Sequence, residues 1–131
     1  MRCVGTVMAL DLSMPVLVVD DYRSMIRIMG DLLRQLGFSD IDGAKDGNEA
    51  LARLRARRYG LVISDWCMEP MSGAALIEKV KADPALAATP VIVVSAEAGA
   101  EEARKAGAAS FLAKPFNART LKGKIEAVLG S

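Results

Sequence analysis

The sequence predicts a doubly wound α/β domain, in which a five-stranded parallel sheet carries five helices on its two faces. Short apolar runs alternate along the whole chain with stretches whose apolar residues recur at helical spacing. The apolar runs lack the polar alternation of half-exposed strands, which indicates that they are buried on both faces. With 131 residues, the chain has the length of one domain, and no linker or short repeat divides it.

The first pair of elements has a clear pattern. The run from Val16 to Val19 is wholly apolar and rich in β-branched residues, so it predicts the first strand. The next stretch carries an apolar stripe at helical spacing, and we expect the whole stripe to face the core. Gly37 is expected to end this helix in the left-handed conformation. The stripe consists of Met25, Ile28, Met29, Leu32, Leu33 and Leu36.

The second and third pairs follow in the same order. A weak strand is predicted over 39–44, and Asp46-Gly47 after it is a turn signal. The second helix is expected over 48–57, where leucines recur at helical spacing. The third strand is predicted over 61–64 because this run is apolar up to its last residue. The third helix is predicted over 73–81.

The last two pairs complete the alternation. The run over 91–94, entered from Pro90, has the strongest strand pattern in the chain. A short alanine-rich helix is predicted over 100–106, and the fifth strand is predicted over 110–113. The last helix is predicted from one apolar face, which consists of Leu121, Ile125, Val128 and Leu129.

Composition excludes several classes of function. The net charge of +1 provides no general field for nucleic acid or for a membrane surface. The chain has no histidine, which excludes a Ser-His-Asp triad and the usual histidine-bearing zinc sites. Its two cysteines, Cys3 and Cys67, do not form a disulfide framework, so a reducing cytoplasm is the expected location. No apolar run approaches the roughly 20 residues that span a bilayer, so no membrane insertion is expected.

The N-terminus precedes the first predicted strand. We interpret residues 1–14 as an N-terminal extension and residues 15–131 as the domain. The extension lacks the basic start and the small-residue cleavage site of a signal peptide. Met14 is an alternative start of the chain.

Polar side chains follow four of the five predicted strands. Asp20 and Asp21 follow the first strand, Asp65 the third, Ser95 the fourth and Lys114 the fifth. In doubly wound sheets, sites form beyond the carboxyl ends of strands, at the point where the strand order reverses. A strand order of 2-1-3-4-5 would therefore bring these side chains together.

The residue types at this edge indicate metal-assisted phosphoryl chemistry. Three neighbouring carboxylates repel each other, and one lysine does not neutralise them. Mg²⁺ prefers carboxylate, carbonyl and water oxygens, so it would balance the charge. An aspartate can act as a nucleophile and form an aspartyl phosphate. Lys114 and Ser95 would then each hold a phosphoryl oxygen.

These motifs resemble the receiver domains of two-component response regulators, and most closely the stand-alone chemotaxis regulators of the CheY type. The resemblance covers about residues 15–130 and implies the flavodoxin-like form of the doubly wound fold. No single motif is diagnostic, but the order and spacing of the set are specific. The set consists of Val-Val-Asp-Asp at 18–21, Asp65-Trp66, Met68, Gly73, Ser95-Ala96-Glu97-Ala98 and Lys114-Pro115-Phe116.

The resemblance implies a role for each residue of the acidic group. Asp65 would be the phosphoacceptor and also a magnesium ligand. Asp21 would bind magnesium directly, and Asp20 would assist, often through water. The backbone carbonyl of Cys67 would be a further ligand.

The resemblance also implies a conformational switch. Lys114 would contact the phosphoryl group, beside a cis Lys114–Pro115 bond. Ser95 would move toward the phosphate, and Phe111 would turn inward when it does. The new phosphate contacts would shift an equilibrium that exists before phosphorylation.

Four features depart from the usual pattern of the family. Glu69 stands where proline is usual, and we expect it to point to solvent. Phe111 lacks the hydroxyl of the more familiar tyrosine. The thiol of Cys67 is interpreted as unreactive, because no basic residue beside it would lower its pKa. The fourth helix is about one turn shorter than usual, which bears on the output face that it forms with the fifth strand and the fifth helix.

The resemblance implies a signalling module rather than an enzyme. The expected phosphodonor is a histidine kinase, and the expected output is a phosphorylation-dependent contact with a protein target, in chemotaxis or motility. A phosphate sink and a phosphorelay adaptor are alternatives. A haloacid-dehalogenase-like phosphatase would need a second aspartate two residues after its nucleophile, whereas Asp20 and Asp21 are adjacent.

A run of four arginines near the end of the second helix suggests nucleic-acid binding. No aromatic residue interleaves with these arginines, so a solvated helix face is the preferred interpretation and no nucleic acid is expected as a partner. The four are Arg53, Arg55, Arg57 and Arg58.

Overall fold

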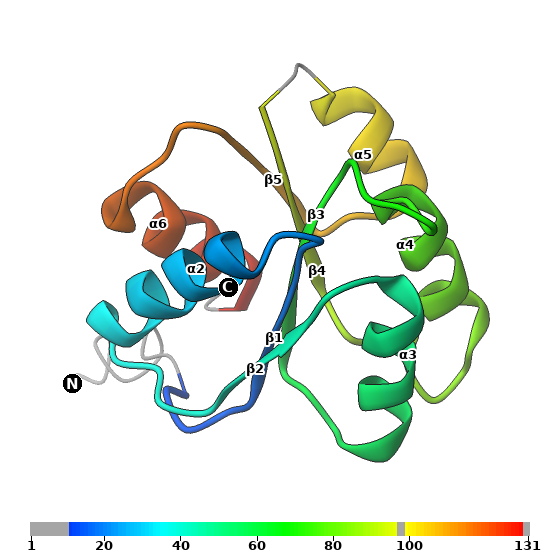
Figure 1. The fold of residues 1–131 in the computed structure, drawn as a ribbon, viewed down its shortest axis with the longest axis horizontal. Coiled ribbons are helices and arrows are strands. Elements are labelled where there is room, and N and C mark those ends of the chain that lie inside the picture. The colour runs from blue at the N-terminus through cyan, green and yellow to red at the C-terminus, as the bar shows by residue number, and fades with distance from the viewer. Residues whose placement is uncertain (1–10, 97–98, 130–131) are drawn as a thin grey trace, which may run out of the picture.

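The computed structural model describes residues 11–96 and 99–129 and shows a parallel sheet between two layers of helices (Figure 1). The elements, in order, are β1 Val16–Val19, α2 Arg23–Gln35, β2 Ile41–Ala44, α3 Gly47–Ala56, β3 Leu61–Asp65, α4 Gly73–Ala82, β4 Val91–Ser95, α5 Ala100–Ala106, β5 Ser110–Ala113 and α6 Ala118–Leu129. The predicted strands and helices are therefore all present, with small shifts at their ends.

The strand order in the sheet is β2-β1-β3-β4-β5, and every neighbouring pair is parallel. The order reverses between β1 and β3, where Val19 lies opposite Ser64. Asp20 and Asp65 directly follow these two residues along their strands. The topology thus confirms the predicted order and places the acidic residues at the switch point.

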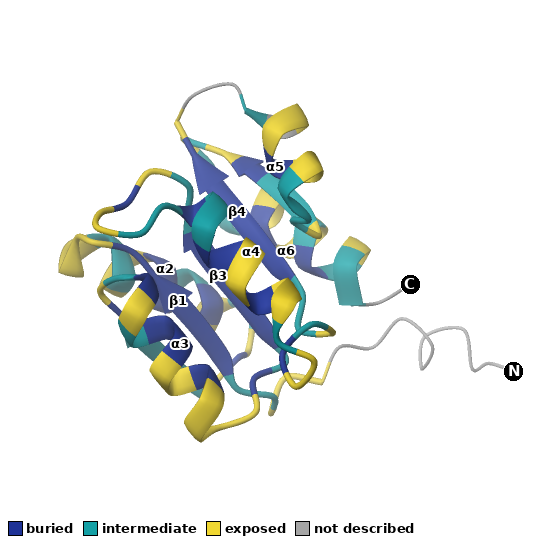
Figure 2. Cartoon of the chain, turned by 90° about the vertical axis from the view of Figure 1, so that its right-hand side faces the viewer, coloured by how far each residue is buried: buried dark blue, intermediate teal, exposed yellow. Residues whose placement is uncertain are grey.

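The sheet separates two apolar cores, and its central strands are buried on both faces (Figure 2). Helices α2 and α6 cover one face, where Leu33, Leu121 and Ile125 pack on β1, β3 and β4. Helices α3, α4 and α5 cover the other, where Leu76 and Ile77 lie in the core. This burial explains why the strands read as continuous apolar runs.

The predicted face of α2 is wrong at one position. Ile28 belongs to the apolar stripe, yet it is 50% exposed. Met29 and Leu33 are buried, and Ile26, which is outside the stripe, packs over the second strand. A Cβ on Gly43 of that strand would lie 2.7 Å from the Ile26 side chain. The small residue in β2 therefore lets the helix rotate toward Ile26 and away from Ile28.

The ends of two helices agree with their sequence signals. Gly37 and Gly107, which follow α2 and α5, have φ of 107° and 106°. Both lie in the left-handed region that glycine adopts without steric cost. Helix α5 is short, at 7 residues, as predicted.

Residues directly before β1 pack on the domain. Leu12 lies against Gly37, where an added Cβ would be 2.7 Å from its side chain. Met14 packs on Gly60 in the same way, and the Gly60 amide donates to the Pro15 carbonyl at 2.9 Å. The prediction of an extension over 1–14 mostly concerns residues outside the described ranges, and it stays a prediction. No helix in the described part of the chain is long and apolar enough to cross a membrane.

Candidate phosphorylation site

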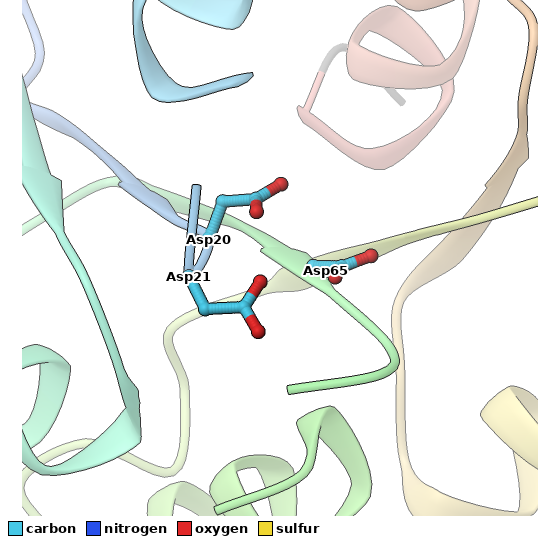
Figure 3. A group of neighbouring side chains, drawn as sticks. All are labelled: Asp20, Asp21 and Asp65. Atoms are coloured by element: carbon cyan, nitrogen blue, oxygen red, sulfur yellow. The ribbon is translucent and has the colours of Figure 1, made fainter. Parts of the chain in front are cut away.

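The acidic group lies where β1 and β3 end side by side. Asp20 and Asp21 follow β1, and Asp65 is the last residue of β3. Their carboxyl groups point to the same side of the sheet edge (Figure 3). One carboxylate oxygen from each lies within 4.8 Å of the others. The structure thus brings together the three aspartates that the sequence predicts as neighbours.

Burial makes this group electrostatically costly. Asp20 is only 6% exposed, and the side chain of Asp65 is 11% exposed. Loss of hydration raises the pKa of Asp20 to about 6, and the nearby Asp65 charge adds to the rise. A hydrogen bond from the Tyr22 amide to Asp20 Oδ1, at 3.0 Å, opposes it. Burial also raises the pKa of Asp65, with a smaller contribution from the charge of Asp21.

Lys114 is the one cation bonded to the group in the described part of the chain. Its Nζ lies 3.6 Å from Asp65 Oδ1, and this contact counters the rise in the pKa of Asp65. The residue follows β5, and its amide donates to the Ser95 carbonyl at 2.8 Å. The Lys114–Pro115 peptide bond is cis. The end of β5 therefore places the ammonium group beside Asp65, the predicted phosphoacceptor.

Two other predicted residues lie on β4 and β5. Ser95 ends β4, is 3% exposed and lies opposite Ala113 of β5. Phe111 lies opposite Val93, is half-buried and packs against the core beneath α3, α4 and α5. The serine and the aromatic ring thus lie on adjacent strands.

Two further residues, Ser64 and Gly73, contact the backbone at the end of β3. The buried hydroxyl of Ser64 donates to the carbonyl of Asp65 at 3.0 Å. The amide of Gly73, at the start of α4, donates to the Trp66 carbonyl at 2.9 Å. A Cβ on Gly73 would lie 2.6 Å from the Asp65 carbonyl oxygen. The sequence signals for these two residues are weak: Ser64 is a hydroxyl in an apolar run, and Gly73 is a glycine at a predicted helix start.

The loop after β3 carries the residues that depart from the family pattern. Glu69 is exposed, which confirms the expectation that it points to solvent. Cys67 is a free, exposed thiol. Trp66, which directly follows Asp65, is half-buried and packs against the apolar core.

The replacement Asp20→Asn should stabilise the protein when no divalent cation is present. Asparagine keeps an oxygen that can accept from the Tyr22 amide but removes a buried charge beside Asp65. The pKa of Asp20 is higher in the folded protein than its ordinary value of 3.8. The folded state therefore binds more protons, and the free energy of unfolding falls as pH rises from 3.8 to about 6. At neutral pH the variant should gain about 1–3 kcal/mol, measured by urea unfolding.

The pH dependence of this gain is the control. The advantage of Asp20→Asn should shrink as pH falls through 6 toward 4, because the wild-type carboxyl then becomes neutral as well. An unchanged or lowered stability at neutral pH would contradict the electrostatic account of this group.

The fold and the acidic group define this chain as a doubly wound α/β domain with a candidate site at its switch point. The profile of the response regulator receiver domain matches residues 16–126. The chain belongs to this family, as its motifs predict.

Relatives of known role agree with the assignment. The chain is 40% identical to the chemotaxis protein CheY-3 of Vibrio cholerae over 122 residues, which cover 91% of this chain and 94% of the relative. It is 42% identical to the chemotaxis protein CheY of Pseudomonas aeruginosa over 118 residues, covering 88% and 95%. The chain is therefore a receiver domain homologous to chemotaxis regulators.

Solved structures confirm the predicted fold. The CheY4 chemotaxis protein of Vibrio cholerae superposes with a TM-score of 0.82 at 32% identity, covering 89% of this chain and 99% of that one. A response regulator receiver protein from Pseudomonas putida has a TM-score of 0.78 at 34% identity, covering 88% and 97%.

Proposed function

We propose that this chain is a phosphorylation switch in which Asp65 accepts a phosphoryl group from a histidine kinase. One observation carries the proposal: the Asp65 carboxylate ends a central strand with two more carboxylates within 4.8 Å and an ammonium group at 3.6 Å. A carboxylate so placed lies among groups that can balance the charge of an incoming phosphoryl group.

Mg²⁺ fits the residues at this site. The donors are hard oxygens, and three carboxylates, of which Asp20 and Asp65 are partly desolvated, leave a local excess of negative charge beside one lysine. Asp20, Asp21 and Asp65 would hold the ion, and the backbone carbonyl of Cys67 is the further ligand that we propose. When bound, the ion would lower the repulsion between the carboxylate and the anionic phosphoryl group.

Three residues of the chain have separate roles in the phosphoryl transfer. An Asp65 carboxylate oxygen attacks the phosphorus of the phosphohistidine and forms an acyl phosphate. The phosphorus–nitrogen bond breaks, and its electron pair stays on the imidazole nitrogen. Lys114 balances charge on one phosphoryl oxygen, and the Ser95 hydroxyl donates to another.

The same contacts would drive the switch. Ser95 ends β4, Lys114 directly follows the adjacent strand β5, and a backbone hydrogen bond of 2.8 Å joins the two residues. Movement of Ser95 toward the phosphate would free space for Phe111 to turn inward. Phe111 lines a cavity of about 280 Å³ between α5, β5 and α6, with Arg104 and Lys124 at its border. This face is the output surface that we propose for a protein target.

The output is most consistent with chemotaxis or motility, because the relatives above are chemotaxis proteins. A phosphate sink and a phosphorelay adaptor share the same phosphoacceptor chemistry. A phosphatase with multiple turnover is the alternative class of function. It is disfavoured because the position two residues after Asp65 does not hold an aspartate that could act as a general base. There the residue is Cys67.

Magnesium titration followed by beryllofluoride tests the proposal, with Trp66 fluorescence as the signal. Trp66 directly follows Asp65, so a saturable change is expected with magnesium, and a second one with beryllofluoride only when magnesium is present. Turnover of p-nitrophenyl phosphate is measured beside it. Sustained multiple turnover would favour the enzyme, and no binding of either ligand would contradict the switch.

A further inference from the structure

The four arginines at the end of α3 are exposed, as the interpretation of a solvated face requires, but three of them also border a cavity. This cavity has a volume of about 310 Å³ and lies between the end of α3 and the loop that follows α4. The cavity lies near the start of β3, at the opposite end of that strand from Asp65. Its lining consists of Leu54, Arg55, Ala56, Arg57, Arg58, Tyr59, Ala85, Leu86 and Thr89.

The base of the cavity is apolar. Leu54, Tyr59 and Leu86 are 4%, 4% and 6% exposed, and all three belong to the core on this face of the sheet. The Tyr59 hydroxyl is occupied, because it donates to Asp42 Oδ2 at 2.5 Å. The base therefore suits an aliphatic side chain and offers no exposed aromatic ring for stacking.

One arginine forms a fixed wall. Arg57 donates to Asp42 Oδ2 at 3.0 Å and also to Asp40, so its guanidinium is tied to the edge strand β2 and the residue before it. Its Cζ lies 5.6 Å from the centre of the Tyr59 ring. The two carboxylates balance its charge, so Arg57 shapes the cavity and leaves recognition of charge to its neighbours.

The other two arginines leave positive charge at the rim. Arg55 lies 3.7 Å from Asp83, and its side chain is 60% exposed, so solvent screens this pair. Arg58 is exposed and forms no ion pair with any residue that the structure describes. None of the lining residues is acidic. An anionic group above the cavity would therefore meet positive charge on two sides.

We propose that this cavity binds an acidic peptide segment of a partner protein. An aliphatic side chain of the segment fills the cavity over Leu54 and Leu86, and its flanking carboxylates pair with Arg55 and Arg58. A volume of about 310 Å³ is at the lower end for small-molecule sites, which suits one or two side chains better than a nucleotide. The absence of an accessible ring in this cavity disfavours single-stranded nucleic acid.

The test uses the full chain labelled with ¹⁵N and the probe acetyl-Glu-Glu-Leu-Glu-Glu-amide. Amide shifts are expected over residues 54–59 and 85–89. The charge reversal Arg58→Glu should weaken binding by about fivefold or more, because an attraction becomes a repulsion. Arg34→Glu is the matched control, since Arg34 is an exposed helical arginine far from the cavity lining and pairs with Asp31. It should leave the affinity unchanged.

Several results would overturn the proposal. Equal weakening by Arg34→Glu would show that only net charge matters, and shifts spread over other basic regions would have the same meaning. Equal binding of acetyl-Gln-Gln-Leu-Gln-Gln-amide would remove the role of the arginines. Inorganic phosphate producing the same shifts would indicate a small-anion site, and tighter binding of oligouridine would indicate a nucleic-acid site. Magnesium and beryllofluoride binding at Asp65 is measured on Arg58→Glu to show that the variant is folded.

Discussion

The replacement Asp65→Asn is expected to abolish phosphorylation while leaving the fold intact. Asparagine has nearly the same shape and keeps the backbone bond that the Asp65 carbonyl accepts from Ser64. It lacks the anionic oxygen that attacks phosphorus, and its amide would be a poor nucleophile. The variant should show no fluorescence response of Trp66 to beryllofluoride in saturating magnesium, and its unfolding by urea should remain cooperative.

A matched control is Asp31→Asn on the exposed face of α2, where the carboxylate only pairs with Arg34. This variant removes the same charge far from the site and should respond like the wild type. A full beryllofluoride response in Asp65→Asn would place the phosphoacceptor elsewhere.

The replacement Gly73→Ala is expected to damage stability and phosphorylation together. An added Cβ would lie 2.6 Å from the Asp65 carbonyl oxygen and 2.9 Å from the Trp66 Cα, which are both backbone atoms. Neither can move without shifting the end of β3 or the start of α4. Overpacking of this kind costs about 1–3 kcal/mol in the free energy of unfolding. A displacement of the nucleophile by about 1 Å can slow a positioned reaction by roughly 100-fold.

Gly123→Ala in α6 separates this effect from the general consequences of replacing glycine. Nothing lies within 4 Å of a Cβ at position 123, so the replacement should stabilise the helix by about 0.5–1 kcal/mol. Phosphorylation from acetyl phosphate is measured for both variants. If Gly73→Ala matched the wild type in stability and in rate, the close approach at Asp65 would not constrain the site.

Much of this site could be predicted from the sequence because each polar residue follows a buried strand. In a parallel sheet the ends of the strands meet at one edge, so linear positions such as those of Asp65 and Lys114 translate directly into proximity. The wholly apolar runs made the strands recognisable, and the family motifs supplied the residue roles that we propose.

The features of the fold and the site that the sequence did not predict depend on contacts between distant segments. The partial burial of Ile26, with Ile28 exposed, follows from the space above Gly43, which no helical periodicity encodes. The close approach of Gly73 to Asp65 and Trp66 requires the packing of the start of α4 on the end of β3. The pairing of the exposed Arg57 with Asp40 and Asp42 joins the end of α3 to β2 and the residue before it, which the local sequence does not encode.

Intact-mass analysis after incubation with acetyl phosphate tests the central claim most directly. The measurement compares the wild-type protein with and without magnesium, and it includes Asp65→Asn with magnesium. Our account predicts a mass increase of one phosphoryl group in the wild type only when magnesium is present, and none in the variant. A magnesium-independent adduct, or an equal adduct in Asp65→Asn, would contradict the assignment of Asp65 as the metal-assisted phosphoacceptor.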